Sequence, residues 1–183
     1  VELVHRLDRD TSGCLLLAKR RPALRALHEI IREGELDKRY RLIVHGRWPK
    51  DLTSVRLPLR KFHTASGERR VRVSADGKAS HTEFQVIETC GEASLLNAEL
   101  ITGRTHQIRV HAQASGHSLV GDRKYASDQE LELAARLGIG RLCLHAERLE
   151  LVWQGKPLAL EAPLPSELVE AWRALSRVSE RSR

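Results

Sequence analysis

The sequence contains little cysteine and few aromatic residues. Three of its 183 residues are cysteine, and Phe, Trp and Tyr together make up 4% of the chain. Cys14, Cys90 and Cys143 are widely spaced and form no CxxC pair, which argues against both a disulfide framework and a zinc knuckle. We therefore expect three reduced thiols in a cytoplasmic protein.

Other absences exclude further classes of protein. No apolar run approaches the roughly 18–20 residues of a membrane span, and the N-terminus lacks the basic and then apolar pattern of a signal peptide. The sequence has neither a glycine-rich phosphate loop nor a set of Cys and His at metal-ligand spacing. His106 and His111 are five positions apart, roughly 140° around a helix, so they do not share a face. We expect no metal, no cofactor and no membrane partner, and a metal hydrolase is disfavoured.

The charge is unevenly distributed along the chain. The formal net charge is +7, but residues 1–75 contain 18 Lys and Arg against 9 Asp and Glu, whereas residues 76–183 contain 13 against 15. A local surplus of positive charge is typical of a surface that binds a polyanion. A membrane surface is a poorer candidate, because no expected helix pairs a basic face with exposed aromatic residues.

The hydrophobic pattern predicts one α+β domain in which strands outnumber helices and are mostly antiparallel. Strands are expected at about 1–3, 14–18, 40–44, 81–90, 93–101, 141–152 and 156–162. Helices are expected at about 22–34, 105–115, 128–137 and 166–178. A tight turn at Gly91-Glu92 should join two of the strands as a hairpin, and Asp10 to Gly13 is expected to be a turn.

One polar segment carries His5, Arg6, Asp8 and two further charged residues between apolar stretches. By itself it is consistent with an ordinary polar turn capped by Asp10. However, His-Arg-Leu-Asp-x-x-Thr-Ser-Gly at 5–13 resembles, at every fixed position, a motif of the RluA family of pseudouridine synthases. Three later segments resemble further motifs of that family in the expected order: Lys38-Arg39-Tyr40, Gly103-Arg104-Thr105-His106-Gln107-Ile108-Arg109 and Arg141-Leu142-Cys143-Leu144-His145.

The resemblance implies the catalytic fold of that family, a mixed and mostly antiparallel central sheet with flanking helices and an active-site cleft. We assign residues 1–178 to this domain and 179–183 to a tail. Members normally have catalytic-domain sequence before the first motif, so we expect an N-terminal truncation and the absence of an S4-type RNA-binding domain. Segments 66–73 and 15–19 resemble the subgroup that modifies bacterial 23S ribosomal RNA.

The implied reaction converts selected uridines in RNA, here 23S ribosomal RNA or its precursor, into pseudouridine, and we expect the enzyme to be a monomer. It breaks the N1–C1′ bond, turns the uracil and joins C5 to C1′, so it requires neither redox cofactor nor ATP. The resemblance assigns the essential carboxylate to Asp8, which could act as a nucleophile at C1′ or at the base, or as a base that removes a ribose proton. Arg104 is expected to pair with Asp8 and keep it ionised. Tyr40 should stack on the uracil and Leu144 pack against its other side, although each could be a structural residue instead.

The remaining candidates are expected to bind RNA. Arg6 is suited to fill the gap left by a uridine that has left its stack, because a guanidinium plane can stack and donate hydrogen bonds together. Candidates for phosphate and other RNA contacts are Arg9, Lys19, Arg20, Arg21, His106 and Arg109. With so few aromatic residues, affinity should come mainly from phosphate contacts. The alternatives are a non-catalytic RNA-binding module and an inactive fragment of such an enzyme.

Overall fold

The computed structural model describes residues 1–181 and confirms the α+β class. The strands are β1 (Glu2–Leu3), β2 (Ser12–Gly13), β3 (Leu17–Ala18), β4 (Asp37–His45), β5 (Ser54–Val55), β6 (Leu59–His63), β7 (Arg69–Val73), β8 (Thr82–Cys90), β9 (Ala93–Leu100), β10 (Leu144–Trp153) and β11 (Lys156–Glu161). The helices are α1 (Arg21–Arg32), α2 (Gln107–Ala114), α3 (Asp128–Arg136) and α4 (Ser166–Arg181). No helix within the described residues is both long and apolar enough to span a membrane.

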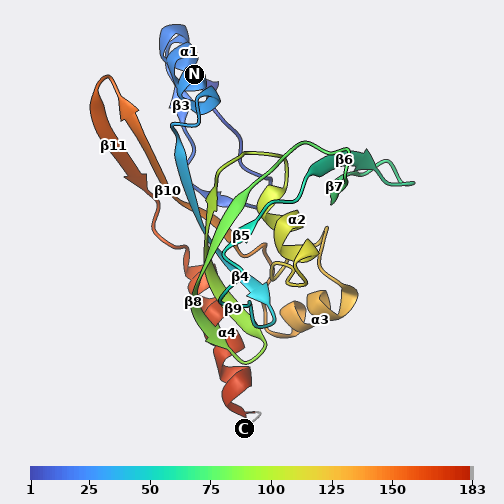
Figure 1. Cartoon of the computed structure of the whole chain (residues 1–183). Helices are drawn as coiled ribbons and strands as arrows, with labels where there is room; N and C mark the ends of the chain where they lie inside the picture. Colours follow the sequence, from blue (N-terminus) through green and yellow to red (C-terminus); the bar gives the residue numbers. More distant parts are fainter. Residues whose placement is uncertain (182–183) are drawn as a thin grey trace.

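A seven-stranded sheet organises the chain (Figure 1). Its order is β11-β10-β4-β9-β8-β5, and β2 pairs with β10 as the seventh strand. The predicted hairpin at Gly91-Glu92 is confirmed by the antiparallel pair β8–β9. Leu42, Ile43 and Val44 of β4 are fully buried, as expected of a continuous apolar run in a strand that is covered on both faces.

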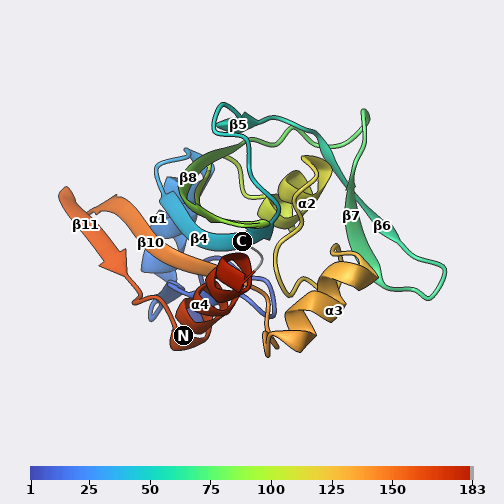
Figure 2. The same ribbon diagram turned by 90° about the horizontal axis from the view of Figure 1, so that it is seen from below.

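The two faces of the sheet are covered by different helices, and α2 and α4 lie on opposite sides of β4 (Figure 2). Leu42 and Val44 pack in one cluster with Ile108 and other residues of α2. Ile43 belongs to a second cluster with residues of α4. Because side chains alternate along a strand, Tyr40 of β4 faces the α2 side and its neighbour in sequence faces the α4 side.

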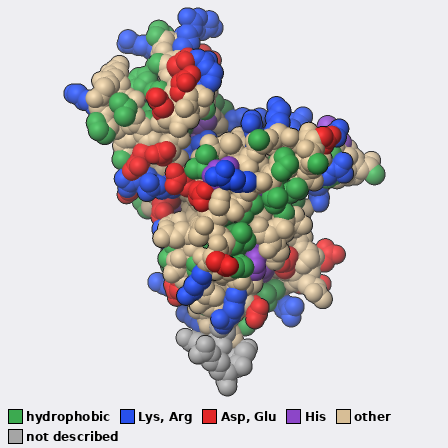
Figure 3. All heavy atoms as spheres, in the orientation of Figure 1, with side chains coloured by type: hydrophobic (Ala, Val, Ile, Leu, Met, Phe, Trp, Pro, Cys, Tyr) green, Lys and Arg blue, Asp and Glu red, His purple; other side chains and the backbone are tan. Residues whose placement is uncertain are grey.

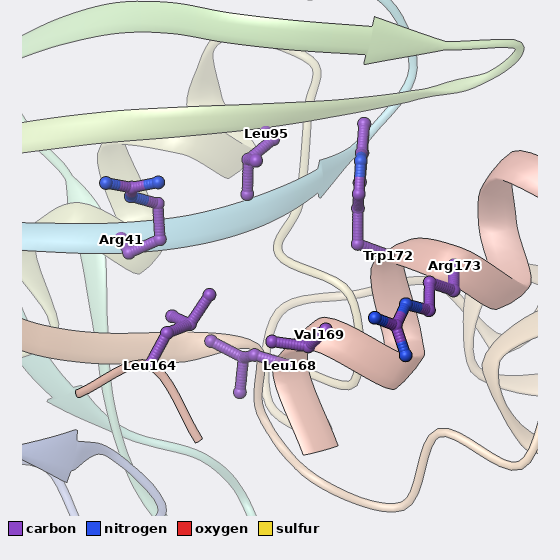
Figure 4. A pocket seen from close by; sticks show the side chains of 7 residues that line it. All are labelled: Arg41, Leu95, Leu164, Leu168, Val169, Trp172 and Arg173. Carbon is purple, nitrogen blue, oxygen red and sulfur yellow. The ribbon is translucent and has the colours of Figure 1, made fainter. Parts of the chain in front are cut away.

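The α4 side holds a small pocket of about 160 Å³ that is almost entirely apolar (Figure 4). Arg41 projects into this region from β4, and its Nη2 donates to both carboxylate oxygens of Glu147, each at 3.1 Å. Leu95, Leu168 and Trp172 also line the pocket. None of the side chains predicted to act on RNA lies here, so the candidate site must be sought on the α2 side.

Some local expectations were wrong. Ser12–Gly13 is a strand rather than part of a turn, because it pairs in parallel with His145–Ala146, a partner that local sequence patterns cannot reveal. Of the expected strand 14–18, only Leu17–Ala18 pairs. Helix α4 continues to Arg181, past the expected start of the tail at 179, and the last two positions of that tail, 182–183, lie outside the described residues.

The hairpin β6–β7 projects from the body of the molecule (Figure 1). Its base is anchored by Leu59 and Val71, which are buried against Val110 of α2 and against Tyr125. Its exposed side chains include several arginines and a lysine. A basic arm is thereby attached to the same face of the sheet as Tyr40.

Candidate active site

The turn that carries Asp8 is followed directly by strand β2, which attaches it to the central sheet. The amide of Thr11 donates to the carbonyl of Asp8 at 3.0 Å, and Gly13 pairs with Ala146 of β10. Gly13 has φ +120°, and a Cβ there would lie 2.1 Å from the Ala146 carbonyl oxygen. Only glycine allows this approach of strand to strand, so the sequence of the motif sets how closely the turn is attached.

A hydrogen-bond network joins the first motif to the last one. Arg141 Nη2 donates to Ser12 Oγ at 2.7 Å, and Ser12 Oγ lies 2.8 Å from His145 Nδ1. His145 Nε2 lies 3.0 Å from the carbonyl oxygen of Ala162, an acceptor, so this nitrogen carries the proton and Nδ1 accepts from Ser12. Arg141 and His145 therefore support the Asp8 turn.

Asp8 forms an ion pair with Arg109 of α2. Arg109 Nη1 lies 3.3 Å from Asp8 Oδ2, and the side chain of Asp8 is 24% exposed. On its other side, Arg109 donates from Nε and Nη2 to the two oxygens of Asp122, at 2.8 and 2.7 Å. Burial opposes the charge of Arg109, but the hydrogen bonds and charges of Asp122 and Asp8 outweigh it and raise the pKa of Arg109.

The expected pairing of Arg104 with Asp8 is wrong, because Arg109 occupies that position. Arg104 is exposed, and its Nε donates to the carbonyl of Ala79 at 3.2 Å. Its backbone amide donates to the side chain of Gln107, which keeps it in the loop before α2. Arg109, predicted to be an RNA contact, is instead a buried partner of two carboxylates.

Tyr40 and Leu144 lie in one apolar cluster beside Asp8. Both side chains are buried, and Leu7 packs against the same cluster. Burial, followed by the negative charge of Asp8, raises the pKa of Tyr40. The Tyr40 hydroxyl therefore stays protonated at neutral pH, next to an apolar surface on one side and a carboxylate on the other.

His106 adopts a left-handed conformation, with φ +53°, just before α2 begins. Its Nδ1 lies 2.6 Å from the hydroxyl of Tyr125, which accepts a hydrogen bond from the amide of Val71 at 3.0 Å. Which of the two atoms donates in this hydrogen bond depends on the tautomer of the histidine. Burial is the main factor that lowers the pKa of His106, which agrees with a neutral ring.

The candidates for phosphate contact lie on the surface. The side chains of Arg6, Arg9, Lys19 and Arg20 are exposed. None of these four forms a hydrogen bond or ion pair through its side chain with the residues that the structure describes, whereas Arg21 lies 3.9 Å from Glu2. The side chains of Arg6, Arg9, Lys19 and Arg20 are therefore accessible to a ligand from solvent.

Two residues of the cluster were missed by sequence reasoning. Asp122 and Tyr125 belong to Gly121-Asp122-Arg123-Lys124-Tyr125, a polar turn that directly follows the buried residues Leu119 and Val120. A charged and aromatic turn after a buried segment was the available signal. No recognised motif covers this turn, so the sequence alone did not point to Asp122 and Tyr125.

Three residues of this site lie in the region that a family model matches. The family model described as RNA pseudouridylate synthase matches residues 1–114, which contain Asp8, Tyr40 and Arg109. The chain belongs to this family. Two solved structures, human RNA pseudouridylate synthase domain containing 4 and domain containing 1, align with TM-scores of 0.78 and 0.79 at 26% identity. They cover 95% and 92% of this chain, and 75% and 72% of theirs.

Curated relatives in the family are more similar in sequence. The chain is 48% identical over 177 residues to ribosomal large subunit pseudouridine synthase C of Pasteurella multocida, with 96% of this chain and 54% of that protein covered. It is 47% identical over 173 residues to the protein of the same name in Escherichia coli, with 92% and 54% covered. These names agree with the subgroup indicated by segments 66–73 and 15–19. The chain spans about half the length of the curated relatives it matches.

Four buried or half-buried histidines predict a loss of stability in mild acid. Burial is the main factor that lowers the pKa of His5, His45, His106 and His111. As pH falls through about 6.5, the unfolded chain takes up protons that the folded chain does not, so the free energy of unfolding decreases. Each such proton contributes up to about 1.4 kcal/mol per pH unit. The check is urea unfolding in steps from pH 7.5 to 5.

The variant His111→Gln serves as the comparison for this experiment. It should be less stable at pH 7.5, because the buried ring accepts from Thr82 and donates to Leu57. Its stability should also change less with pH, because one of the four groups is missing. A wild-type stability that stays constant or rises as the pH falls from 7 to 5 would contradict the assignment of neutral buried rings.

Proposed function

We propose that the protein isomerises uridine to pseudouridine in large-subunit ribosomal RNA, in the cytoplasm, with Asp8 as the essential carboxylate. The observation that carries the proposal is Asp8 beside the buried ring of Tyr40 and the buried cation Arg109. Membership of the RNA pseudouridylate synthase family and the names of the bacterial relatives support the reaction and the substrate class.

The geometry leaves one oxygen of Asp8 available for chemistry. Arg109 contacts Oδ2, and no residue in the described part of the chain donates to Oδ1. In the reaction the N1–C1′ bond breaks, the C5–C1′ bond forms, C5 loses its hydrogen and N1 gains one, so the composition is unchanged. During these steps the unpaired Oδ1 can attack carbon or remove a proton, and both routes stay open.

Tyr40 and Leu144 are suited to hold the uracil while it is detached from the ribose. Their burial in one apolar cluster offers the flat face of a base a surface without competing water. Because the hydroxyl of Tyr40 is protonated at neutral pH, it is a potential hydrogen-bond donor to the base rather than a second anion. A uracil stacked on this cluster would be shielded from water on that face.

RNA affinity would come from basic side chains around the Asp8 turn and on the hairpin β6–β7. In Figure 3, Lys and Arg side chains gather over α1 and over the hairpin. On the hairpin, Lys61, Arg69 and Arg72 are exposed. Together with Arg9, Lys19 and Arg20, these residues could contact phosphates on both sides of a uridine that enters the site.

The first test is Asp8→Asn, an isosteric change that removes the charge required for chemistry. We expect loss of pseudouridine formation to below about a thousandth of the wild-type rate, with RNA affinity within a few-fold. The matched control is Asp10→Asn, the same substitution two residues along the same exposed turn, which should leave the rate nearly unchanged. Pseudouridine is mapped by carbodiimide primer extension on unmodified large-subunit RNA. Substantial turnover by Asp8→Asn would remove this carboxylate from the reaction.

A phosphate-driven interface predicts a steep dependence of affinity on salt. If about five phosphates are neutralised, log affinity should fall linearly with log salt with a slope of about −3.5 to −4.5. Replacing Lys19 and Arg20 together by alanine should reduce that slope by about 1.5. Arg136→Ala, which removes an exposed charge from α3, should leave the slope unchanged. A flat response to salt in the wild type would point to a small-molecule substrate.

Arg6 is tested by comparing folded and unstructured RNA of the same core sequence. If its guanidinium fills the gap left by the displaced uridine, Arg6→Ala should slow single-turnover reaction on a stem-loop. It should matter much less on the unstructured RNA, where little stacking is lost. Equal losses on both RNAs would make Arg6 a general contact and assign the displacing role to another residue.

A further inference from the structure

Residues 121–125 form part of the connection between α2 and α3 and lie against Arg141, which supports the Asp8 turn. Gly121 has φ +77°, and a Cβ there would lie 2.0 Å from the carbonyl oxygen of Arg141. The loop is therefore pressed against the residue that donates to Ser12. The next residue, Asp122, has a side chain with no exposed surface.

Asp122 determines which edge of Arg109 reaches Asp8. A guanidinium has a planar fork of N–H donors, and Asp122 engages the Nε and Nη2 donors of that fork. The Nη1 group is left for Asp8. Asp122 Oδ1 also accepts from the amides of Lys124 and Tyr125, at 3.0 and 3.3 Å, so the carboxylate cannot easily rotate.

Tyr125 restrains the same guanidinium from a second direction. The central carbon of the Arg109 guanidinium lies 5.1 Å from the centre of the Tyr125 ring, within the range of a cation–π contact. The ring is itself fixed by its hydroxyl, which bonds to Val71 of the hairpin and to His106. Asp122 thus grips Arg109 in its plane, and Tyr125 covers its face.

We propose that Asp122 and Tyr125 are positioning residues that hold Arg109 so that it contacts only one oxygen of Asp8. Without Asp122, the free fork of Arg109 would favour a bidentate pair with Asp8, and both carboxylate oxygens would then be occupied. The inference rests on the proposed function, because its measured effect is the rate of pseudouridine formation.

The experiment measures single-turnover rate at saturating RNA, RNA affinity and thermal stability in the full-length protein. Asp122→Asn should lower the rate roughly 10- to 100-fold, as expected for a small misplacement of a reacting group, with RNA affinity within a few-fold. The matched control is Glu147→Gln, the same kind of change in the carboxylate that pairs with Arg41 on the opposite face of the sheet. It should lower stability without a comparable loss of rate.

A double-mutant cycle separates positioning from a general loss of structure. Lysine cannot form the two-point contact with Asp122. In an Arg109→Lys background, Asp122→Asn should therefore cost less than about threefold, since residues that act through one partner are not additive. An equal loss in both backgrounds, or no loss in the wild-type background, would overturn the proposal.

Tyr125 provides a second route if Asp122→Asn does not fold. Tyr125→Leu should lower the rate about tenfold at saturating RNA, and Tyr125→Phe, which keeps the ring over Arg109, should recover most of it. Equal rates for the two variants would overturn the role of the ring. If the wild-type protein itself forms no pseudouridine, the proposed function fails, and that result is distinct from a wild-type enzyme whose rate is insensitive to these changes.

Discussion

The buried cation Arg109 is the interaction on which the candidate site depends. Removing an arginine from water costs several kcal/mol unless carboxylates and hydrogen bonds compensate. Here one carboxylate, Asp122, is fully buried and the other, Asp8, is partly exposed. Asp122, with its two hydrogen bonds, compensates for most of the cost of burying Arg109. Asp8 can therefore stay partly exposed and accessible to a substrate. The contact with Asp122 thus stabilises Arg109, and the longer contact with Asp8 belongs to the candidate site.

Several separate parts of the chain converge on that cation. Helix α2 carries it, the loop 121–125 holds it through Asp122, and the turn 8–11 presents Asp8 to it. That turn is supported by Arg141 and His145, which hydrogen-bond to Ser12. Arg141 and His145, which belong to a motif of their own, thus support the position of Asp8 in the first motif.

The sequence predicted the class of the fold, the hairpin at Gly91-Glu92 and the segments that meet around Asp8. It did not predict which arginine of the motif at 103–109 faces that carboxylate. The helix was expected to begin at about Thr105, directly after Arg104, but α2 begins at Gln107. The left-handed residue His106 turns the chain just before the helix, so Arg104 stays in an exposed loop, whereas Arg109 lies within the helix and is buried. The parallel pairing of β2 was likewise invisible, because its partner is far away in the sequence.

The attachment of β2 to β10 also has a consequence for the order in which the molecule is assembled. Ser12 and Gly13 pair with residues 133 positions later in the chain, and contacts of such sequence separation form slowly because a long loop must be closed first. During synthesis, the segment bearing Asp8 leaves the ribosome long before the strand that anchors it. The carboxylate therefore acquires its fixed position only after residues 145 and 146 have been made, and until then a nascent chain exposes the basic side chains around Asp8 without the finished geometry of the candidate site.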